Sequence, residues 1–307
     1  MAPMAPAEQT ISVALRNATD LLQSASTTPR LDAELLLVAS TTLSRTAVNA
    51  FPERVLDERQ WQQFSRLVAR RAQGEPLAYL LGSQEFWSLC LAVSPAVLIP
   101  RPETELIVER ALKHLPAASI ARVLDLATGS GAIALAIASE RPKAIIVATD
   151  ISETALEVAR SNAARIGLER VAFRAGNWFA PLANERFSLI ASNPPYIAEG
   201  DPDLEPAVLA FEPRIALIAG LSGWEALTHI AAQAPRHLEP GGWLVLEHGW
   251  RQAPNLRNLL EQAGFRHVRS HADLAGHERV TEGQWVGKRE ESGQRTADST
   301  DPESNSD

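Results

Sequence analysis

Val123-Leu124-Asp125-Leu126-Ala127-Thr128-Gly129-Ser130-Gly131 is the stretch that decides the fold of this 307-residue chain. Its apolar start is typical of a strand buried in a parallel sheet, and its glycines permit a tight turn into a helix. Asp150 closes the next predicted strand, where a carboxylate can accept both hydroxyls of a ribose. The turn and Asp150 together predict a nucleoside cofactor, and a purely structural turn is the alternative.

The segments on both sides of this stretch continue the alternation of strands and helices. Strands are predicted, from their apolar runs, over residues 123–126, 144–148, 171–173, 187–191 and 243–247, with two closing strands around Val268 and over 280–286. Helices are predicted from Ala132 onward and over 153–166, 224–234 and 253–263. This order predicts an α/β fold, a seven-stranded Rossmann-like sheet with helices on both faces. The sheet domain is expected over residues 101–288, followed by a disordered acidic tail over 289–307.

The first 75 residues show helical spacing and no convincing strand. The apolar positions expected on the inner faces of the first two helices are Ile11, Leu15, Ala18, Leu21 and Leu22, and then Leu31, Leu35 and Val38. A third helix is expected from Asp57, as N-cap, to Gly74, as C-cap. Residues 1–75 are therefore predicted to form a small all-helical domain, which either stabilises the protein or docks a macromolecular substrate.

Residues 76–100 are predicted to link the helical domain to the sheet. Two short extended pieces, 84–89 and 90–93, are expected to pair as a β-hairpin. Cys90 has apolar neighbours in the sequence and is expected to be an inert core side chain.

The composition narrows the range of possible functions. The chain is 45% hydrophobic and 21% charged, as in a soluble globular protein, and has no apolar run long enough for a membrane span. Its start lacks the features of a secretion signal, so we expect a cytoplasmic protein. A net charge of −8 argues against stable nucleic-acid binding. A single cysteine and no cluster at ligand spacing predict neither a disulfide nor a structural metal.

Ser192-Asn193-Pro194-Pro195-Tyr196 follows the predicted fourth strand. Because proline restricts the residue before it, Asn193 and Pro194 are expected to be extended and to form a rigid corner. The side-chain oxygen of Asn193 and the carbonyl oxygen of Pro194 can then point at one small volume, beside the flat ring of Tyr196. Two converging acceptors fit the two donors of a planar NH₂ group. An ordinary turn at the end of the strand is the alternative.

This corner decides between two classes of cofactor. A dinucleotide would place its pyrophosphate at the glycine turn, where Ala134 could stand in for a third glycine. Hydride transfer has no use for a clamp on an NH₂ group, whereas methyl transfer from S-adenosylmethionine to such a group does. The clamp is needed because the lone pair of an amide nitrogen is delocalised, so the nitrogen must be oriented. The sequence therefore predicts an S-adenosylmethionine-dependent methyltransferase.

Further motifs extend this pattern over residues 76–287. They are Pro76 to Gly82, Glu85-Phe86-Trp87, Leu98 to Glu105, the Asp125 to Gly131 turn, Asn193 to Tyr196, Phe211-Glu212-Pro213 and Glu247 to Trp250. Together they resemble the bacterial release-factor glutamine methyltransferase family, PrmC/HemK. Amino-methyltransferases of DNA and RNA share the Asn193 to Tyr196 motif, but the Leu98 to Glu105 segment is much more specific to this family.

The resemblance implies both a substrate and a set of site residues. It implies methylation of the side-chain amide nitrogen, N5, of the glutamine in the Gly-Gly-Gln motif of peptide chain release factors 1 and 2. It implies a cofactor site formed by Ala127, Thr128, Gly129, Ser130, Gly131, Asp150, Trp178 and Asn193. It implies a glutamine site formed by Asn193, Pro194, Pro195 and Tyr196, of which Asn193, Pro194 and Tyr196 are the catalytic members. Trp178 is expected against the adenine, with a place in the core as the alternative.

The chain also departs from the family pattern. Ala127 stands where glycine is usual, and its methyl group is tolerable only if its φ angle is negative. Asn177 replaces a common aspartate before Trp178, and its amide oxygen can still accept an adenine N–H. Ala219 and His277 replace glycine and arginine, which affects local loop shape.

Two groups of charged residues have open interpretations. Arg101, Glu103 and Glu105 could form a gate over the methyl group or contact the incoming loop, or they could simply begin a helix. Glu247 and His248 could serve acid–base chemistry, although a structural histidine is the favoured interpretation.

Two rival functions use the same residues differently. A DNA or RNA amino-methyltransferase would hold adenine or cytosine in the corner, but the chain lacks a basic strip with interleaved aromatic residues. A cofactor-binding regulatory module would have no turnover, and the intact pair of acceptors argues against it.

Overall fold

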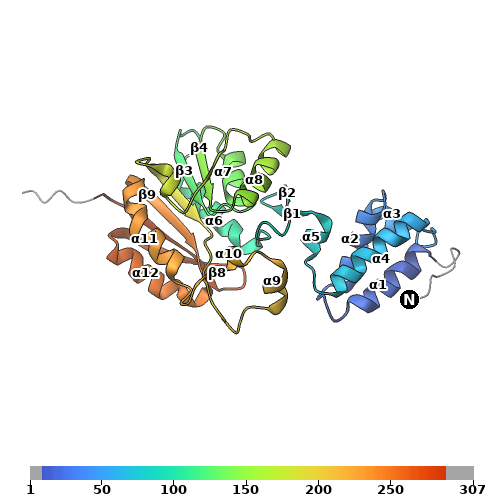
Figure 1. Cartoon of the computed structure of the whole chain (residues 1–307). Coiled ribbons are helices and arrows are strands. Elements are labelled where there is room, and N and C mark those ends of the chain that lie inside the picture. Colours follow the sequence, from blue (N-terminus) through green and yellow to red (C-terminus); the bar gives the residue numbers. More distant parts are fainter. Residues whose placement is uncertain (1–8, 288–307) are drawn as a thin grey trace, which may run out of the picture.

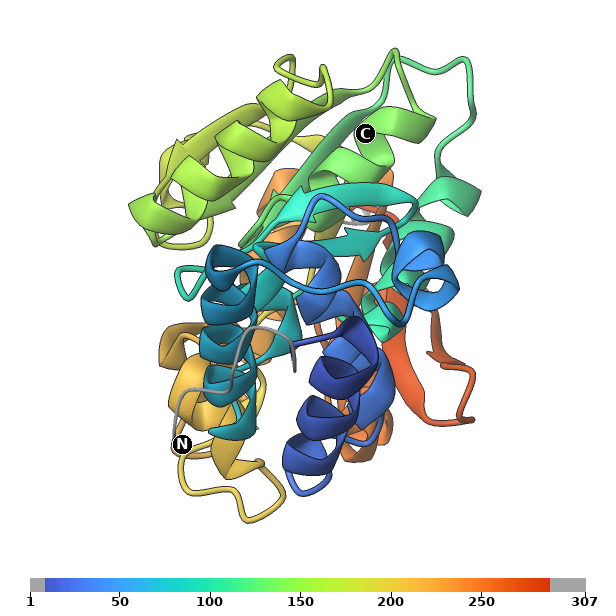
Figure 2. The ribbon, with the colours of Figure 1, turned by 90° about the vertical axis from the view of Figure 1, so that its right-hand side faces the viewer.

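The computed structural model describes residues 9–287, in which a bundle of helices is joined to a larger α/β part by a β-hairpin (Figure 1). The bundle consists of α1 (Ile11–Leu22), α2 (Pro29–Ser40), α3 (Arg45–Ala50) and α4 (Glu58–Ala72). The connection consists of α5 (Leu77–Leu81), β1 (Ser83–Phe86) and β2 (Leu89–Ala92). The predicted tail over 289–307 lies outside the described residues. Figure 2 shows the bundle in front of the sheet.

The N-cap of α4 is confirmed at Asp57, whereas its C-cap is Gln73, one residue before the predicted Gly74. The predicted inner face of α1 is confirmed except at Leu21, and the inner face of α2 differs from the prediction. Asp57 forms a capping box with Gln60, and Gly74 follows the helix with a φ of +92°. The predicted Leu21 is 53% exposed, and α2 buries Ala33, Leu36 and Leu37 instead of Leu31, Leu35 and Val38. The prediction failed because α2 also buries two acids, Asp32 and Glu34, which pair with arginines. Apolar spacing does not count such paired charges.

The predicted hairpin forms, with its turn at Trp87 and Ser88. β1 and β2 are antiparallel and pair Phe86 with Leu89, so the turn lies earlier than the sequence suggested. Alternation along β2 buries Leu91 and leaves Cys90 exposed, so the prediction of a core cysteine was wrong.

The predicted seven-stranded sheet is confirmed, with the order β10-β11-β9-β6-β3-β4-β5. Its strands are β3 (Arg122–Leu126), β4 (Ile145–Asp150), β5 (Ala172–Ala175), β6 (Phe187–Ser192), β9 (Leu238–Glu247), β10 (Phe265–Ala272) and β11 (Glu278–Trp285). The pairs among β3, β4, β5, β6 and β9 are parallel, and β11 joins this group antiparallel to β9. The carboxyl ends of β3, β4 and β6 therefore meet at one edge of the sheet.

Helices cover both faces of the sheet, as predicted. The main ones are α6 (Glu105–His114), α7 (Ala132–Glu140), α8 (Glu153–Arg165), α11 (Glu225–His237) and α12 (Ala253–Gln262). One buried cluster joins Ile107 of α6 and Leu135 of α7 to the sheet, and a second joins Leu227 of α11 and Leu256 of α12 to its other face. Within residues 9–287, no helix has both the length and the apolar character needed to cross a membrane.

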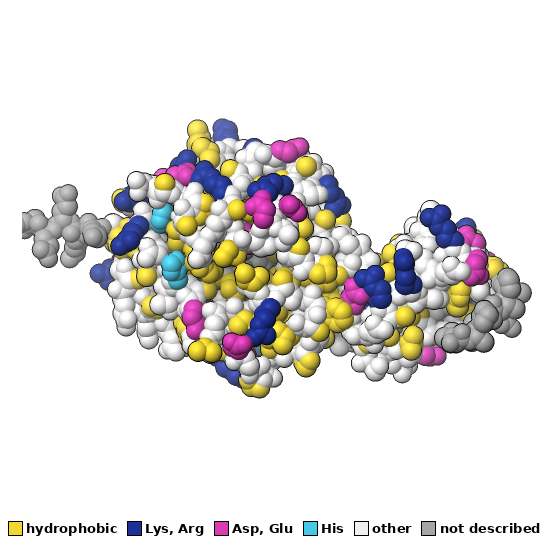
Figure 3. Space-filling model, viewed as in Figure 1, with side chains coloured by type: hydrophobic (Ala, Val, Ile, Leu, Met, Phe, Trp, Pro, Cys, Tyr) yellow, Lys and Arg dark blue, Asp and Glu magenta, His cyan; other side chains and the backbone are white. Residues whose placement is uncertain are grey.

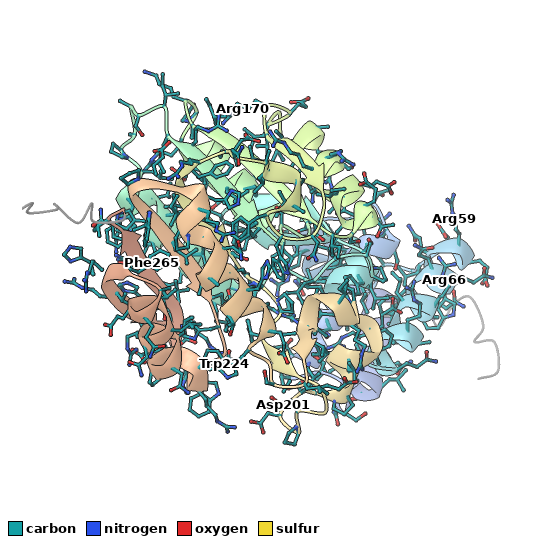
Figure 4. All side chains as sticks on the ribbon, turned by 60° about the vertical axis from the view of Figure 1, so that its left-hand side comes forward. Arg59, Arg66, Arg170, Asp201, Trp224 and Phe265 are labelled. Carbon is teal, nitrogen blue, oxygen red and sulfur yellow. The ribbon has the colours of Figure 1, made fainter. Side chains whose placement is uncertain are left out.

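The segment between β6 and α11 forms an outer lobe that the sequence did not predict. It contains β7 (Ile197–Ala198), α9 (Pro206–Phe211), α10 (Arg214–Leu217) and β8 (Ile218–Gly220). Figure 4 shows Asp201 at the outer end of this lobe and Trp224 where the chain returns to α11. β7 and β8 pair with each other, apart from the main sheet.

Candidate active site

The glycine turn between β3 and α7 is fixed by a buried carboxylate. Oδ2 of Asp125 accepts hydrogen bonds from Oγ1 of Thr128 at 2.6 Å and from the backbone N of Ala134 at 3.1 Å. Gly131 has a φ of +85°, and a Cβ there would lie 3.0 Å from Cδ1 of Leu135. Glycine is therefore required at Gly131, for its backbone conformation and for the space around it.

Asp150 is held beside this turn by backbone donors. Its Oδ2 accepts from the N of Gly129 at 2.9 Å, and its Oδ1 accepts from the N of Ser152 at 2.9 Å. Each carboxylate oxygen can accept a further hydrogen bond. Burial raises the pKa of Asp150, and it raises the pKa of Asp125 to about 7.

Ala127 adopts a backbone conformation that is unfavourable for any residue with a side chain. We expected a negative φ, but the angle is +57°, in the left-handed region that favours glycine. The expectation was wrong because the chain turns at Ala127 from β3 toward the glycine turn with this positive φ. Of the other departures, Ala219 lines the cavity described next, and His277 lies between β10 and β11.

A cavity of about 440 Å³ opens where the glycine turn, Asp150 and the corner after β6 meet. The predicted site residues that line it are Ala127, Thr128, Gly129, Ser130, Asp150, Trp178, Asn193 and Pro195. Gly131, Pro194 and Tyr196 are near it in the chain but are not lining residues. Figure 3 shows hydrophobic side chains gathered across the middle of the α/β part. Most of the residues that complete the lining are also apolar, among them Leu98, Ile133 and Ile215.

Trp178 lies both in the lining of the cavity and against the core. It is half-buried, lines the cavity and packs against the apolar cluster that contains Leu227. Its ring centroid lies 6.1 Å from that of His229, another lining residue. Asn177 is exposed and also lines the cavity. An aromatic face and an amide are thus available on the side of the cavity near β5.

The corner after β6 keeps two acceptors free. Oγ of Ser192 donates to the carbonyl of Leu126 at 2.7 Å, which fixes the end of β6 against β3. Nδ2 of Asn193 donates to Oγ1 of Thr104 at 3.1 Å. Among the described residues, no hydrogen bond occupies Oδ1 of Asn193 or the carbonyl oxygen of Pro194.

The structure brings three residues to this corner whose roles sequence reasoning missed. Thr104 contacts Asn193, and Glu247, at the end of β9, accepts a hydrogen bond from the Tyr196 hydroxyl at 3.2 Å. Gln252 donates through Nε2 to the carbonyl of Tyr196 at 3.3 Å. Thr104 and Glu247 belong to motifs that the resemblance had singled out, but neither motif indicated that they meet.

The charged side chains of Arg101, Glu103 and Glu105 do not line the cavity, although their neighbours Pro100 and Thr104 do. Arg101 forms an ion pair with Glu212, and Oε1 of Glu105 accepts from the N of Trp87 in the hairpin turn at 2.7 Å. Glu103 is exposed. Arg101, Glu103 and Glu105 are not among the lining residues, so their contacts favour the interpretation as a helix start.

His248 has the contacts of a structural histidine. It is fully buried, with Nε2 at 2.8 Å from Oγ1 of Thr281 and Nδ1 at 2.9 Å from the carbonyl oxygen of Gly249. Burial lowers the pKa of His248. A neutral, hydrogen-bonded imidazole away from the cavity lining is poorly placed for acid–base chemistry.

The cavity fits the nucleoside cofactor that the sequence predicts. Apart from its two chain neighbours, no described residue has an atom within 4 Å of the position that a Cβ on Gly129 would take, so a ligand can approach this backbone closely. Asp150 lines the cavity with acceptor capacity to spare. Oδ1 of Asp125 is buried and has no hydrogen-bond partner within residues 9–287. Asp125 is fully buried and is not a lining residue, so it fixes the turn from behind and leaves the ligand contacts to the residues that line the cavity.

Comparisons with known proteins agree with this geometry. Residues 13–82 match the family model described as PrmC N-terminal domain, and residues 105–209 match that of the methyltransferase small domain. The chain is 52% identical to the release factor glutamine methyltransferase of Xylella fastidiosa (strain Temecula1), over 84% of this chain and 94% of that protein. It is 46% identical to the release factor glutamine methyltransferase of Vibrio cholerae serotype O1, over 92% of this chain and 99% of that protein.

A solved structure supports the fold alone. The catalytic domain of hMettl16, in complex with MAT2A 3′UTR hairpin 6, matches with a TM-score of 0.53 at 17% identity. The match covers 73% of this chain and 83% of that one.

Proposed function

We propose a chemical role for each part of the site in this chain, which belongs to the family of release factor glutamine methyltransferases. The enzyme uses S-adenosylmethionine and methylates the side-chain amide nitrogen, N5, of a glutamine. The glutamine is that of the Gly-Gly-Gln motif in peptide chain release factors 1 and 2. This substrate places the enzyme in the cytoplasm, where translation ends.

The glycine turn and Asp150 hold the cofactor, which supplies a methyl group on a positively charged sulfur. The free acceptor capacity of Asp150 is the support for binding ribose hydroxyls there. The turn from Ala127 to Gly131 lets the ligand lie against the backbone. Trp178 and Asn177 hold the adenine, the first by its ring face and the second by its amide oxygen.

Asn193 and Pro194 hold the glutamine, and one observation carries this assignment. The amide NH₂ of Asn193 is engaged by Thr104, which leaves its Oδ1 and the Pro194 carbonyl as the free acceptors of the corner. These two oxygens accept the two N–H bonds of the glutamine amide and fix its nitrogen in one orientation. No strong general base is required, because the N-methylated amide can lose its extra proton to water. Pro195 lines the same cavity, and Tyr196 supports the corner from behind.

The helical domain predicted over residues 1–75 docks the release factor beside the cavity. In support, its end contacts the outer lobe: a Cβ on Gly74 would lie 3.7 Å from Cε2 of Phe211, the last residue of α9. Arg59 and Arg66 of α4 are exposed on the side of the bundle away from the sheet (Figure 4). Residues 76–100 act as the link, and residues 101–288 carry the chemistry.

A labelling experiment tests this function against its rivals. The full chain is incubated with S-adenosylmethionine labelled on its methyl group and, in separate reactions, with a release factor, with the variant whose motif glutamine is alanine, and with DNA. We expect label on the release factor only. Label on the alanine variant or on DNA alone would overturn the proposal, and an absence of label in all reactions would favour a binding module without turnover.

A further inference from the structure

A buried carboxylate lies directly behind the Asn193 corner. Glu247 is the last residue of β9 and only 2% exposed. Its Oε2 accepts a hydrogen bond from Oγ1 of Thr104 at 2.7 Å, and its Oε1 accepts one from the hydroxyl of Tyr196 at 3.2 Å. Thr104 is itself 4% exposed and accepts from Nδ2 of Asn193 at 3.1 Å. Three elements distant in sequence thus end in one chain of hydrogen bonds.

The direction of these bonds follows from the chemistry of the groups. Burial raises the pKa of Glu247 to about 7, so the carboxyl group is ionised above that pH. An ionised carboxylate can only accept, so both hydroxyls that contact Glu247 must then donate to it. The hydroxyl of Thr104 has one proton, and Glu247 takes it. Toward Asn193 the Thr104 oxygen can therefore only accept. The amide of Asn193 must then present its NH₂ to Thr104 and direct its oxygen the other way.

We propose that Glu247 and Thr104 are positioning residues that fix which end of the Asn193 carboxamide faces the substrate. This inference rests on the proposed role of Asn193 as acceptor for the glutamine NH₂. Rotating the amide by half a turn would exchange its oxygen for an NH₂, which would meet the substrate NH₂ donor to donor. Nothing in the shape of the side chain prevents that rotation, because the two orientations are nearly isosteric. The Glu247–Thr104 pair prevents it electrostatically.

The backbone of the corner is held by hydrogen bonds that do not involve Thr104. The role proposed for Thr104 is therefore to orient the Asn193 side chain and not to support the backbone. Gln252 donates through Nε2 to the carbonyls of Tyr196 at 3.3 Å and Gly223 at 3.1 Å. Its Oε1 accepts from the N of Gly249 at 2.8 Å, so its own orientation is fixed. The path of the chain after β6 therefore does not depend on Thr104 alone. Removing the Thr104 hydroxyl should therefore change the orientation of the Asn193 amide more than the backbone conformation of the corner.

The matched pair Thr104→Val and Thr104→Ser tests the proposal in the full chain. Valine keeps the shape without the hydroxyl, whereas serine keeps the hydroxyl. With a release factor as substrate, we expect Thr104→Val to lower kcat by about 10- to 100-fold. This loss is smaller than that expected for complete removal of an oriented hydrogen-bonding group from the site. The Kd for S-adenosylmethionine and the KM for the release factor should change by less than about threefold. Thr104→Ser should restore most of kcat. Equal kcat in the valine variant and the unchanged enzyme would overturn the proposal.

A double variant separates positioning from general stability. If Thr104 acts through Asn193, then Asn193→Ala with Thr104→Val should be no slower than Asn193→Ala alone. Multiplicative losses would mean that Thr104 acts elsewhere and would overturn the inference. Asn193→Ala alone distinguishes the proposed role of Asn193 from the positioning role of Thr104. Full activity of Asn193→Ala would refute the proposed role of Asn193. If Asn193→Ala were inactive while Thr104→Val kept full activity, only the positioning role of Thr104 and Glu247 would be refuted.

Glu247→Gln provides the second, independent variant. A glutamine amide can turn its NH₂ toward Thr104, which frees the Thr104 proton to donate to Asn193 and selects the wrong end of the Asn193 amide. We expect a loss of kcat similar to that of Thr104→Val, with the Kd for S-adenosylmethionine unchanged within about threefold. Unchanged kcat in Glu247→Gln would overturn the role of the carboxylate.

Discussion

Arg101 and Glu212 form an ion pair across 111 positions of the chain and join two motifs at the rim of the cavity. Glu212 is 5% exposed, and its second oxygen accepts from the backbone N of Ile99 at 3.0 Å. The carboxylate therefore fixes both a side chain and the backbone of the segment that carries Pro100 and Thr104 to the cavity. The buried carboxylate of Glu212 thus holds the outer lobe against the segment from Ile99 to Thr104.

Replacing Glu212 by alanine should destabilise the protein by about 1–3 kcal/mol, because the buried N–H of Ile99 loses its acceptor and Arg101 its partner. Arg101 is partly exposed and can reach water, which limits the loss. The free energy of unfolding in urea measures the effect. Glu199→Ala is the matched control, because the Arg214–Glu199 pair is exposed on both sides and should contribute less than about 1 kcal/mol. Equal effects of the two substitutions would contradict the prediction.

Much of the fold could be predicted because its signals are local. The apolar runs and the glycine turn predicted the strands of the sheet and the position of Asp150 beside Gly129. The outer lobe carried no such signal, since its helices are short and α9 buries no residue. Contacts such as that between Thr104 and Glu247 join residues 143 positions apart and depend on tertiary packing, which no local spacing reveals. The site was therefore predicted as a list of motifs, without the connections among them.

Ala127→Gly should stabilise the protein. The left-handed conformation at Ala127 costs an alanine about 1–2 kcal/mol, which glycine would not incur. Glycine also increases the conformational entropy of the unfolded chain, and this offsets part of the gain in stability. We expect a net increase of roughly 0.5–1 kcal/mol in the free energy of unfolding. Ala69→Gly in the exposed face of α4 is the control and should lose about 1 kcal/mol instead. A loss of the same size at Ala127 would show that the turn relaxes to a different conformation.

The ionisation of Asp125 should make stability depend on pH. Burial raises the pKa of Asp125 to about 7 from its usual value of 3.8. Between these values the folded protein binds a proton at Asp125 that the unfolded chain releases, so the free energy of unfolding falls as the pH rises. The slope approaches about 1.4 kcal/mol per pH unit within this window.

Asp125→Asn isolates this contribution from that of other groups. Asparagine does not titrate, and its amide oxygen can still accept from Thr128 and Ala134. The stability of the unchanged protein relative to this variant should fall steadily between pH 5 and pH 7. His248 has the opposite effect, because its lowered pKa favours the folded state as the pH rises. Its contribution largely cancels when the free energy of unfolding of the variant is subtracted from that of the unchanged protein. A difference that is constant with pH would show that Asp125 titrates normally.

Asn193→Ala and Asp150→Ala should separate methyl transfer from cofactor binding. Without the Asn193 oxygen, the glutamine loses one of its two acceptors, and we expect kcat to fall by about 100- to 1,000-fold. The Kd for S-adenosylmethionine should remain within a few-fold, because the ribose contacts proposed for Asp150 are unaffected. Asp150→Ala should give the reverse result, with a Kd raised about tenfold or more and kcat at saturating cofactor within a few-fold. Isothermal titration and saturating kinetics measure the two quantities.

The Asp150 variant requires a stability control, because Asp150 also accepts from Gly129 and Ser152 in the ligand-free protein. Urea unfolding without cofactor shows whether the turn survives at the temperature of the assay. If Asn193→Ala weakened cofactor binding as strongly as it slowed transfer, Asn193 would serve mainly to shape the cavity. The free oxygens of the corner would then lose their role as acceptors, and the methyl acceptor would have to be held by other lining groups.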